Sequence, residues 1–202
     1  AKYRKLYTCF INFPFVYPPV NKGTSTKNNQ FLVYKALVPV RDSVIRYRFH
    51  RMLNTGIWDA AVAQPTLGMD LSIVSLISQN PDVINKRIQF WYRCEPIYRE
   101  VPSQSYFRNS AILLALFDPC APENVLTPTN YIHSASLGDA IAHIEQTRYM
   151  SPTTIPSLVP LVPTDATFTV PEQEIRNYCE KEGILYLPIR EKHVTEDVRT
   201  IL

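Results

Sequence analysis

The sequence predicts an α/β domain built on a mostly parallel β-sheet. The first observation is an almost unbroken apolar run, Ile112–Phe117, which stops at Asp118 and Pro119. A run without polar alternation is typical of a strand that is buried on both faces, as in parallel sheets. The second observation is that strand-like runs and helix-like segments follow one another along the chain, which is the order of an α/β fold.

The expected elements begin at residue 31. The β-rich run Phe31–Val40 predicts the first strand, and Leu71–Ile77 with Arg87–Trp91 predicts a hairpin whose turn lies in Ser78–Asn85. Further strands are expected at Ile112–Phe117, Ser157–Val162 and Ile184–Ile189, and helices at Ser43–Met52, Leu137–Met150, Pro171–Glu182 and Thr195–Leu202, with a short helix between Trp91 and Ile112.

Single residues sharpen these expectations. Gly183 is a good C-terminal stop for the helix before it. Pro160 has no amide donor and is poorly tolerated inside a central strand. The side chains that we expect in the core are Trp91, Phe107, Leu114 and Phe117.

Two segments stand outside this pattern. Residues 1–30 are predicted to form an extended basic and aromatic N-terminal arm, because its prolines and irregular apolar spacing support neither helix nor strand. Residues 119–136 form a proline-rich insertion without periodicity, longer than a usual connection. With 46% hydrophobic residues in 202, the chain can bury one core, and residues 31–202 are expected to be that domain.

Charge and cysteine content narrow the class of protein. Residues 1–41 hold seven basic residues and no acid, and the rest of the chain has 14 basic against 18 acidic residues. No apolar run approaches the roughly 20 residues of a membrane-spanning helix, and the first segment lacks the order of a secretory signal. Four cysteines lie far apart without a Cys-x-x-Cys pair, which argues against a zinc ribbon or a disulfide framework. We therefore expect a reducing or at least thiol-tolerant compartment.

The stretch from Ile88 to Asp118 resembles part of a known family. A strand ends in Trp91, a Tyr106-Phe107-Arg108 helix end follows, and a hydrophobic strand closes on Asp118. Aligned without a gap, this stretch resembles the second switch region of Rab-type small GTPases. The resemblance implies a Ras-like, doubly wound fold of about six strands, with helices on both faces of a mostly parallel sheet.

The phosphate loop of that family is replaced. The family follows its first strand with Gly-x-x-x-x-Gly-Lys-Ser, whereas this chain continues from Arg41 to Tyr47 without a glycine. Glycines let backbone amides surround the phosphates, and β-branched Val44 and Ile45 do not readily adopt such a nest. Arg46 falls near the family's lysine, and we interpret it as a solvated arginine on a helix face.

The other signature motifs are reduced to single residues. Thr66 falls on the family's magnesium-binding threonine, while Tyr92–Pro96 replaces its Asp-Thr-Ala-Gly-Gln switch. Asp165 falls on the base-recognising aspartate without the Asn and Lys that precede it, and Arg190–Lys192 replaces the Ser-Ala-Lys loop. We interpret Thr66 and Asp165 as vestigial matches in turn or capping positions. The resemblance with these losses implies that no nucleotide, metal or other cofactor is bound.

Catalysis is not expected. An active GTPase would need a new phosphate nest and a new base site. A hydrolase built on Asp118, His133 and Ser134 would need a nucleophile elbow such as Gly-x-Ser-x-Gly, which the sequence lacks. His133 and His143 share no face with a Cys, Asp or Glu at metal-ligand spacing, so a metal site is not expected either.

We therefore expect a non-catalytic, Rab-like pseudo-GTPase that acts as a structural or interaction subunit of a larger protein assembly. The arm combines aromatic side chains that favour burial with basic ones that favour an acidic or phosphate surface. The expected partner-binding residues are Phe10, Phe13, Phe15, Tyr17, Lys2, Arg4 and Lys5. The alternatives are a divergent GTP-binding switch protein and an RNA-contacting subunit of a ribonucleoprotein, which would use the arm for phosphate contacts and base stacking.

The ends of the chain suggest a compartment. No cysteine lies near Leu202, so the prenyl anchor of Rab proteins is not expected. An acid-free start at Ala1 fits removal of an initiator methionine or of a transit peptide. We expect an intracellular protein and favour a mitochondrial assembly over a cytoplasmic or cytoskeletal one.

Overall fold

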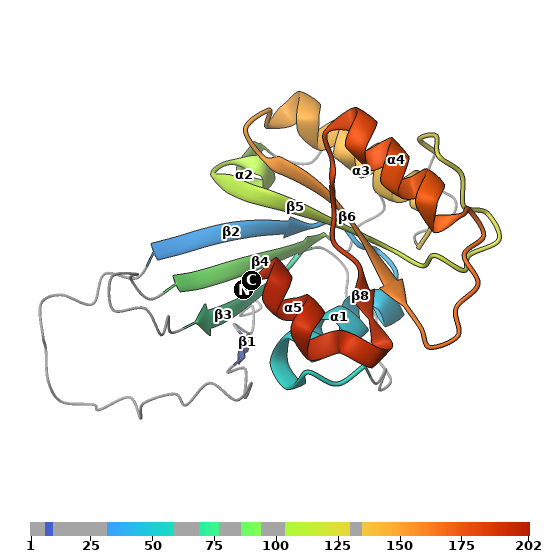
Figure 1. Ribbon diagram of the computed structural model, residues 1–202. Coiled ribbons are helices and arrows are strands. Elements are labelled where there is room, and N and C mark those ends of the chain that lie inside the picture. The colour runs from blue at the N-terminus through green and yellow to red at the C-terminus, as the bar shows by residue number, and fades with distance from the viewer. Residues whose placement is uncertain (1–6, 10–31, 59–68, 77–85, 94–103, 130–134) are drawn as a thin grey trace, which may run out of the picture.

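A mixed, mostly parallel sheet forms the middle of the computed structural model, with helices on both faces (Figure 1). The structure describes residues 7–9, 32–58, 69–76, 86–93, 104–129 and 135–202. The strands are β1 (Tyr7–Cys9), β2 (Leu32–Val38), β3 (Met69–Leu76), β4 (Lys86–Arg93), β5 (Ser110–Phe117), β6 (Ile155–Val162), β7 (Leu185–Tyr186) and β8 (Ile189–Arg190). The helices are α1 (Ser43–Thr55), α2 (Gln104–Phe107), α3 (Leu137–Met150), α4 (Glu172–Glu182) and α5 (Val194–Ile201), with a 3-10 turn, η1 (Glu191–His193). The fold is α/β, as the sequence predicts.

The strand order reverses in the middle of the sheet. The strands lie in the order β1-β3-β4-β2-β5-β6-β7, and β8 also pairs with β6. β3 runs antiparallel to β4, which confirms the pairing of the expected hairpin, while its predicted turn, Ser78–Asn85, lies outside the described residues. β2 pairs in parallel with β4 on one side and β5 on the other. Ligands in open α/β sheets bind outside the carboxyl ends of the strands at such a reversal. The carboxyl ends of β2 and β5 are therefore the first place to look for a site.

Side chains of the sheet enter two cores, one on each face. The core beneath α1 and α5 includes Phe49, Phe90 and Leu114, each at most 1% exposed. The core beneath α3 and α4 includes Phe107 and Phe117. The burial expected for Phe107, Leu114 and Phe117 is confirmed.

Trp91 is only half-buried, although the sequence predicts it in the core. The Nζ atom of Lys35 lies 4.0 Å from the centroid of its ring. That ammonium also donates hydrogen bonds to the carbonyl oxygens of Ser105 (2.9 Å) and Arg108 (3.2 Å), at the end of α2. The Lys35 side chain therefore covers this face of the indole ring, and its ammonium forms a cation–π contact with the ring.

Helix boundaries follow their capping residues. α1 runs three residues beyond the expected Met52 and ends at Gly56, whose φ of 67° is left-handed and whose N–H bonds to the Met52 carbonyl. Glycine adopts this conformation without a steric penalty, so the helix continues until the chain supplies one. α3 has the expected bounds, and α4 ends at Gly183 as predicted.

β6 is a central strand that contains two prolines, so the expectation that Pro160 is poorly tolerated in such a position is wrong. In a parallel ladder, successive residues direct their backbone groups to opposite neighbours. Leu158 accepts a hydrogen bond from Leu187 N (2.9 Å), so its backbone faces the β7–β8 side. Pro156 and Pro160 share that parity. Their missing donors therefore face the two short strands, and the ladder with β5 loses no donor.

The run Ile184–Ile189, expected as one strand, is divided into β7 and β8. β7 pairs with Ser157 and Leu158, whereas β8 pairs with Leu161 and Val162. The break lies opposite Pro160, where β6 cannot donate. η1 and α5 then complete the described chain.

The N-terminal arm contains a strand that the sequence does not predict. Tyr7–Cys9 forms β1, which pairs in parallel with β3. The free edge of a sheet offers backbone donors and acceptors to any extended segment, whatever its apolar spacing. Residues 1–6 and 10–30 of the arm lie outside the described residues.

The insertion has no helix or strand over 119–129 and 135–136, as expected, but it is bonded to its own domain. Thr129 N donates to Gly138 O (3.2 Å), and its Oγ1 donates to Asp139 Oδ1 (2.9 Å). Thr169 N donates to Pro119 O (3.0 Å). These bonds fix this part of the insertion against the start of α3 and the segment before α4.

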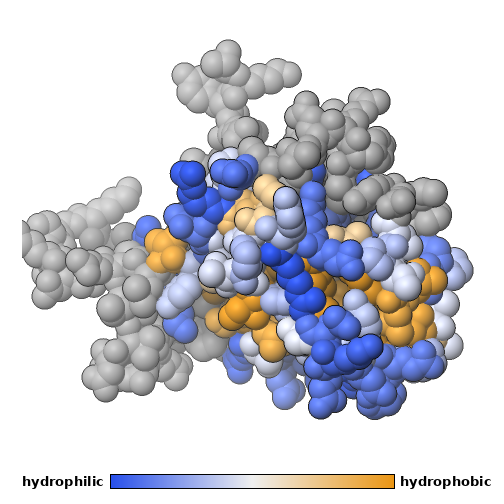
Figure 2. All heavy atoms as spheres, turned by 90° about the horizontal axis from the view of Figure 1, so that it is seen from above, coloured by the Kyte–Doolittle hydropathy of each residue, from blue (hydrophilic) through white to orange (hydrophobic). Residues whose placement is uncertain are grey.

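The surface over α3 and α4 is mixed in character. Figure 2 looks down on this side and shows hydrophilic side chains interrupted by hydrophobic patches. Within the described ranges, no helix is both long and apolar enough to cross a membrane.

Candidate functional site

A pocket of about 220 Å³ lies at the carboxyl ends of β2, β5 and β6, where the strand order reverses. Its walls come from the start of α1, the segment after β5, the residues before α3 and the end of β6. The lining residues are Asp42, Val44, Ile45, Arg48, Asp118, Ala135, Leu161 and Pro163. This is the position at which open α/β sheets bind ligands, so the pocket is the candidate site.

A carboxylate of the chain itself occupies the N-terminus of α1. Asp42 is the N-cap, and its Oδ1 accepts a hydrogen bond from Ile45 N at 2.9 Å. A helix N-terminus attracts anions because its free amides and its dipole point outward. Asp42 supplies that anion from within the chain. Its negative charge would repel a phosphate placed at the same helix end.

The segment that leads into α1 does not form a phosphate nest. A nest of consecutive amides combines right-handed and left-handed residues. In the described part of the chain, positive φ occurs at Asn109, Asp165, Gly56 and Gly183, and all four lie outside the stretch from Pro39 to Ser43. The lack of glycine in this segment predicts that it does not form an amide nest, and its backbone conformation agrees with that prediction.

Arg46 is only 7% exposed, so its interpretation as a solvated arginine is wrong. It lies on the inward side of α1 with Ile45 and Phe49, where its long aliphatic stem can pack against apolar neighbours. The cation that lines the pocket is Arg48. Its guanidinium carbon lies 5.1 Å from the ring centroid of Trp58, in a cation–π contact.

Asp118, the second carboxylate of the pocket, is also bound to its own backbone. Its Oδ1 accepts from Cys120 N at 2.9 Å. Its carbonyl accepts from Asn124 Nδ2 (2.8 Å), and Asn124 Oδ1 in turn accepts from Leu137 N (2.8 Å). Sequence reasoning missed Asn124, whose only signal is an amide side chain in a loop before a helix. Asp42 thus caps the start of α1, and Asp118 binds the backbone of the loop after β5. His133 and Ser134, the other two residues of the hydrolase alternative, lie outside the described residues.

Next to the pocket, a buried ion pair joins the segment after β2 to α3. Arg41 Nη2 lies 3.6 Å from Asp139 Oδ2, and these side chains are 11% and 3% exposed. His143, one turn further along α3, is fully buried. Burial, with the nearby charges of Arg93 and Arg41, lowers its pKa to about 3, so it is neutral at physiological pH. Among the residues that the structure describes, no three His, Cys, Asp or Glu side chains gather as a metal site.

The positions that the resemblance assigns to base recognition contact one another. Asp165 sits in an exposed turn with a φ of 59°, which confirms its interpretation as a turn residue. Its Oδ1 lies 3.9 Å from Lys192 Nζ. Thr164 N donates to Glu191 Oε2 at 2.6 Å, and this bond lowers the pKa of Glu191. The loop after β6 and the turn after β8 are thus tied together by these two contacts.

The remaining predicted site residues lie outside the described part of the chain. They are Thr66, the aromatic residues Phe10, Phe13, Phe15 and Tyr17, and the basic residues Lys2, Arg4 and Lys5. Their roles stay predictions. No protein-family model and no curated protein matches this sequence.

Proposed function

We propose that this protein is a non-catalytic, Rab-like pseudo-GTPase that acts as a structural subunit of a protein assembly. The observation that carries the proposal is the Asp42 carboxylate on the N-terminus of α1, inside the pocket at the strand reversal. In nucleotide-binding α/β proteins this helix end receives a phosphate. Here the chain fills it with its own negative charge.

The arrangement of the sheet supports the Rab-like part of the proposal. A strand, β2, leads directly into α1 at the reversal point, and the hairpin of β3 and β4 follows on one side. Asp118 follows the next strand, β5, beside α1 in the same pocket. These are the relative positions that the resemblance gives to the phosphate loop, the switch strands and the strand that closes on an aspartate.

The contacts of the two base-site loops support the loss of nucleotide binding. A guanine would need the Asp165 carboxylate and the backbone around Lys192 to be available. Instead Lys192 lies beside Asp165, and Glu191 accepts the amide of Thr164. The Lys192–Asp165 pair is exposed and weak by itself, whereas the Glu191 bond is short and fixes the backbone.

Partner binding is proposed for the N-terminal arm and the outer rim of the insertion. The inner side of the insertion is bonded to the domain, but Val125, Thr127 and Pro128 remain exposed. The arm supplies aromatic and basic side chains without a single acid. Such a segment is suited to a partner with an apolar, acidic surface.

A nucleotide-binding measurement tests this proposal. The purified protein should show no saturable binding of GTP or GDP at micromolar concentrations, with or without magnesium, and denaturation should release no stoichiometric nucleotide. Asp165→Asn is the matched variant. Guanine nucleotide binding that this variant weakens would instead establish the divergent switch alternative.

The RNA alternative has its own signature. Binding through phosphates weakens steeply with salt. If the assembly dissociates after RNase treatment and the affinity falls steeply with salt concentration, the arm contacts RNA instead of protein.

A further inference from the structure

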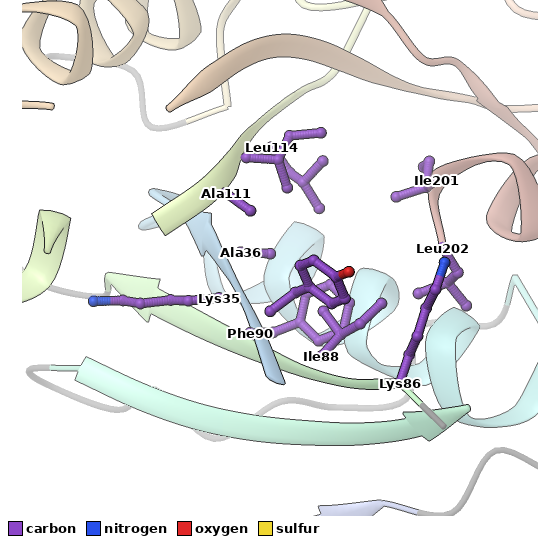
Figure 3. Close-up of a pocket in the computed structure, with 11 residues that line it drawn as sticks. Lys35, Ala36, Lys86, Ile88, Phe90, Ala111, Leu114, Ile201 and Leu202 are labelled. Atoms are coloured by element: carbon purple, nitrogen blue, oxygen red, sulfur yellow. The ribbon is translucent and has the colours of Figure 1, made fainter. Parts of the chain in front are cut away.

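A second pocket, of about 260 Å³, opens at the opposite end of the sheet. It lies between the amino-terminal parts of β2, β4 and β5 and the end of α5 (Figure 3). Its floor is apolar and includes Ile88, Phe90 and Leu114. Figure 3 shows Lys86 standing beside Leu202 at the mouth, whereas Lys35 points away from the pocket.

An exposed apolar stripe continues this pocket across the sheet. Tyr34 is 39% exposed, Ile155 51% and Leu185 46%. Ile155 pairs with Ile112 of the pocket wall, and Leu185 pairs with Ser157, two residues further along β6. Since residues two apart share a face of a strand, these side chains all lie on the α1–α5 face. We call Tyr34, Ile112, Ile155 and Leu185 the amino-end stripe.

The described part of α5 leaves the stripe exposed. α5 has eight residues, and only its end, Ile201 and Leu202, packs against this side of the pocket. The 14-residue α3 covers the opposite face more fully. A sheet face with three large apolar side chains this exposed marks an interaction surface.

The positive charge of Lys86 at the mouth of the pocket indicates the charge of the group that binds there. Lys86 is half-buried, and its ammonium forms no ion pair with any residue that the structure describes. A half-buried cation beside an apolar surface favours a carboxylate in the group that covers it.

Two other occupants fit this charge poorly. Residues 10–31 directly precede β2 in the sequence, but they contain lysines and no Asp or Glu, so they cannot supply the carboxylate. A second copy docked stripe to stripe about a two-fold axis that passes near the pocket mouth would bring Lys86 towards its own equivalent. Like charges at a closed interface are costly.

We propose that the amino-end stripe and its pocket bind an apolar segment of a partner protein that carries an Asp or Glu opposite Lys86. The segment places two or more apolar side chains on Tyr34, Ile155 and Leu185 and enters the pocket beside Ile201 and Leu202. This proposal rests on the proposed role as an assembly subunit and names the surface of the domain that the assembly covers.

Site-specific photo-crosslinking of the full-length protein in its assembly tests the proposal. A photoreactive phenylalanine analogue replaces Ile155, and the matched control carries it at Tyr149, an 87% exposed residue of α3. Mass spectrometry of the Ile155 product should identify a peptide from another protein with two or more apolar residues and an Asp or Glu. A synthetic copy of that peptide then serves as the probe for binding.

Charge exchange provides the decisive measurement. Lys86→Glu should weaken binding of the synthetic peptide at least tenfold, and replacing the peptide's acid by lysine should restore it. Lys181 is an exposed lysine on α4, and Lys181→Glu should leave binding unchanged.

A crosslink from Ile155 to residues 10–31 or to a second copy overturns the proposal, as does the absence of any crosslink or of any effect of Lys86→Glu. If stoichiometric partners copurify while Ile155 fails to crosslink, the stripe proposal fails and the subunit role stands; if the protein is monomeric and holds nucleotide, both fail.

Discussion

Asp197 holds together the last strand and the last helix through one arginine. Its two carboxylate oxygens accept three hydrogen bonds, from Arg190 N (2.8 Å), Nε (3.0 Å) and Nη2 (2.7 Å). Burial by itself raises the pKa of Asp197, but the hydrogen bonds and charge of Arg190 outweigh it, so the pKa is lower than usual. The folded state therefore prefers the ionised carboxylate more than the unfolded chain does.

We expect Asp197→Asn to lower the free energy of unfolding at pH 7 by about 1.5–3 kcal/mol, the usual range for hydrogen bonds to a charged group. Because the folded-state pKa is lowered, this stabilisation is complete above the unfolded pKa near 4 and is lost as the pH falls through the folded value. Urea unfolding at pH 7 and pH 3 measures the difference between variant and parent. Glu196→Gln, on the exposed neighbour, is the control, and a difference that stays constant with pH would contradict this role.

Some features of the candidate site can be predicted from the residue types alone, and others cannot. The absence of glycine between Arg41 and Tyr47 already predicts that no phosphate nest forms, because the backbone requirement is read directly from residue identity. The cap formed by Asp42 is not determined by residue type alone, because it depends on the 2.9 Å hydrogen bond that Ile45 N donates to Asp42 Oδ1. The burial of Arg46 was missed because an arginine near a helix start packs by its stem as readily as it faces water.

At the scale of elements, α3 and the insertion meet at a glycine. A Cβ atom on Gly138 would lie 2.4 Å from Thr129 Cγ2 and 3.0 Å from the Thr127 carbonyl oxygen. The adjacent hydrogen bonds from Thr129 to Gly138 O and Asp139 Oδ1 fix that approach. Only a glycine lets the insertion lie this close to the helix.

Gly138→Ala should therefore destabilise the protein. Overpacking costs about 1–3 kcal/mol, and the better helix propensity of alanine returns at most about 1 kcal/mol. The double variant with Thr129→Ala removes the side chain that clashes. Its loss of stability in chemical denaturation should be smaller than the sum of the two single losses. Additive losses would mean that the insertion shifts away without strain.

The elements were predictable where one local signal dominated. The antiparallel hairpin, α3 and the stop at Gly183 follow from periodicity and capping residues. The division into β7 and β8 does not, because it depends on which side of β6 the nitrogen of Pro160 faces. That direction becomes visible only when the register with β5 and the bond from Leu187 N to Leu158 O are known.

For the whole molecule, both cores are built from β2 onward. Every buried residue of the two clusters lies between Ala36 and Val198. Among the described residues, the arm contributes β1 at the edge of β3 and no member of either cluster. The domain should therefore fold without the arm, while its proposed partner contacts should not survive.

Deleting residues 1–28 is expected to release the protein from its assembly while its circular dichroism and cooperative thermal unfolding are retained. Copurification followed by size-exclusion chromatography measures the release. A second variant with serine at Phe10, Phe13, Phe15 and Tyr17 keeps β1 and isolates the aromatic contacts. Normal assembly by both variants would refute docking through the arm, and an unfolded deletion variant would show that β1 is essential to the fold.

Pro156 and Pro160 also determine how this sheet can grow. A strand from another chain joins a sheet by pairing along a continuous row of edge donors and acceptors. On the side of β6, the described edge consists of two strands of two residues each, with a break opposite Pro160. Such short, interrupted edge strands offer few donors and acceptors to a further strand, so strand addition on that side is disfavoured. Among the described strands, β1 forms the opposite edge, and we expect strand addition to occur there instead.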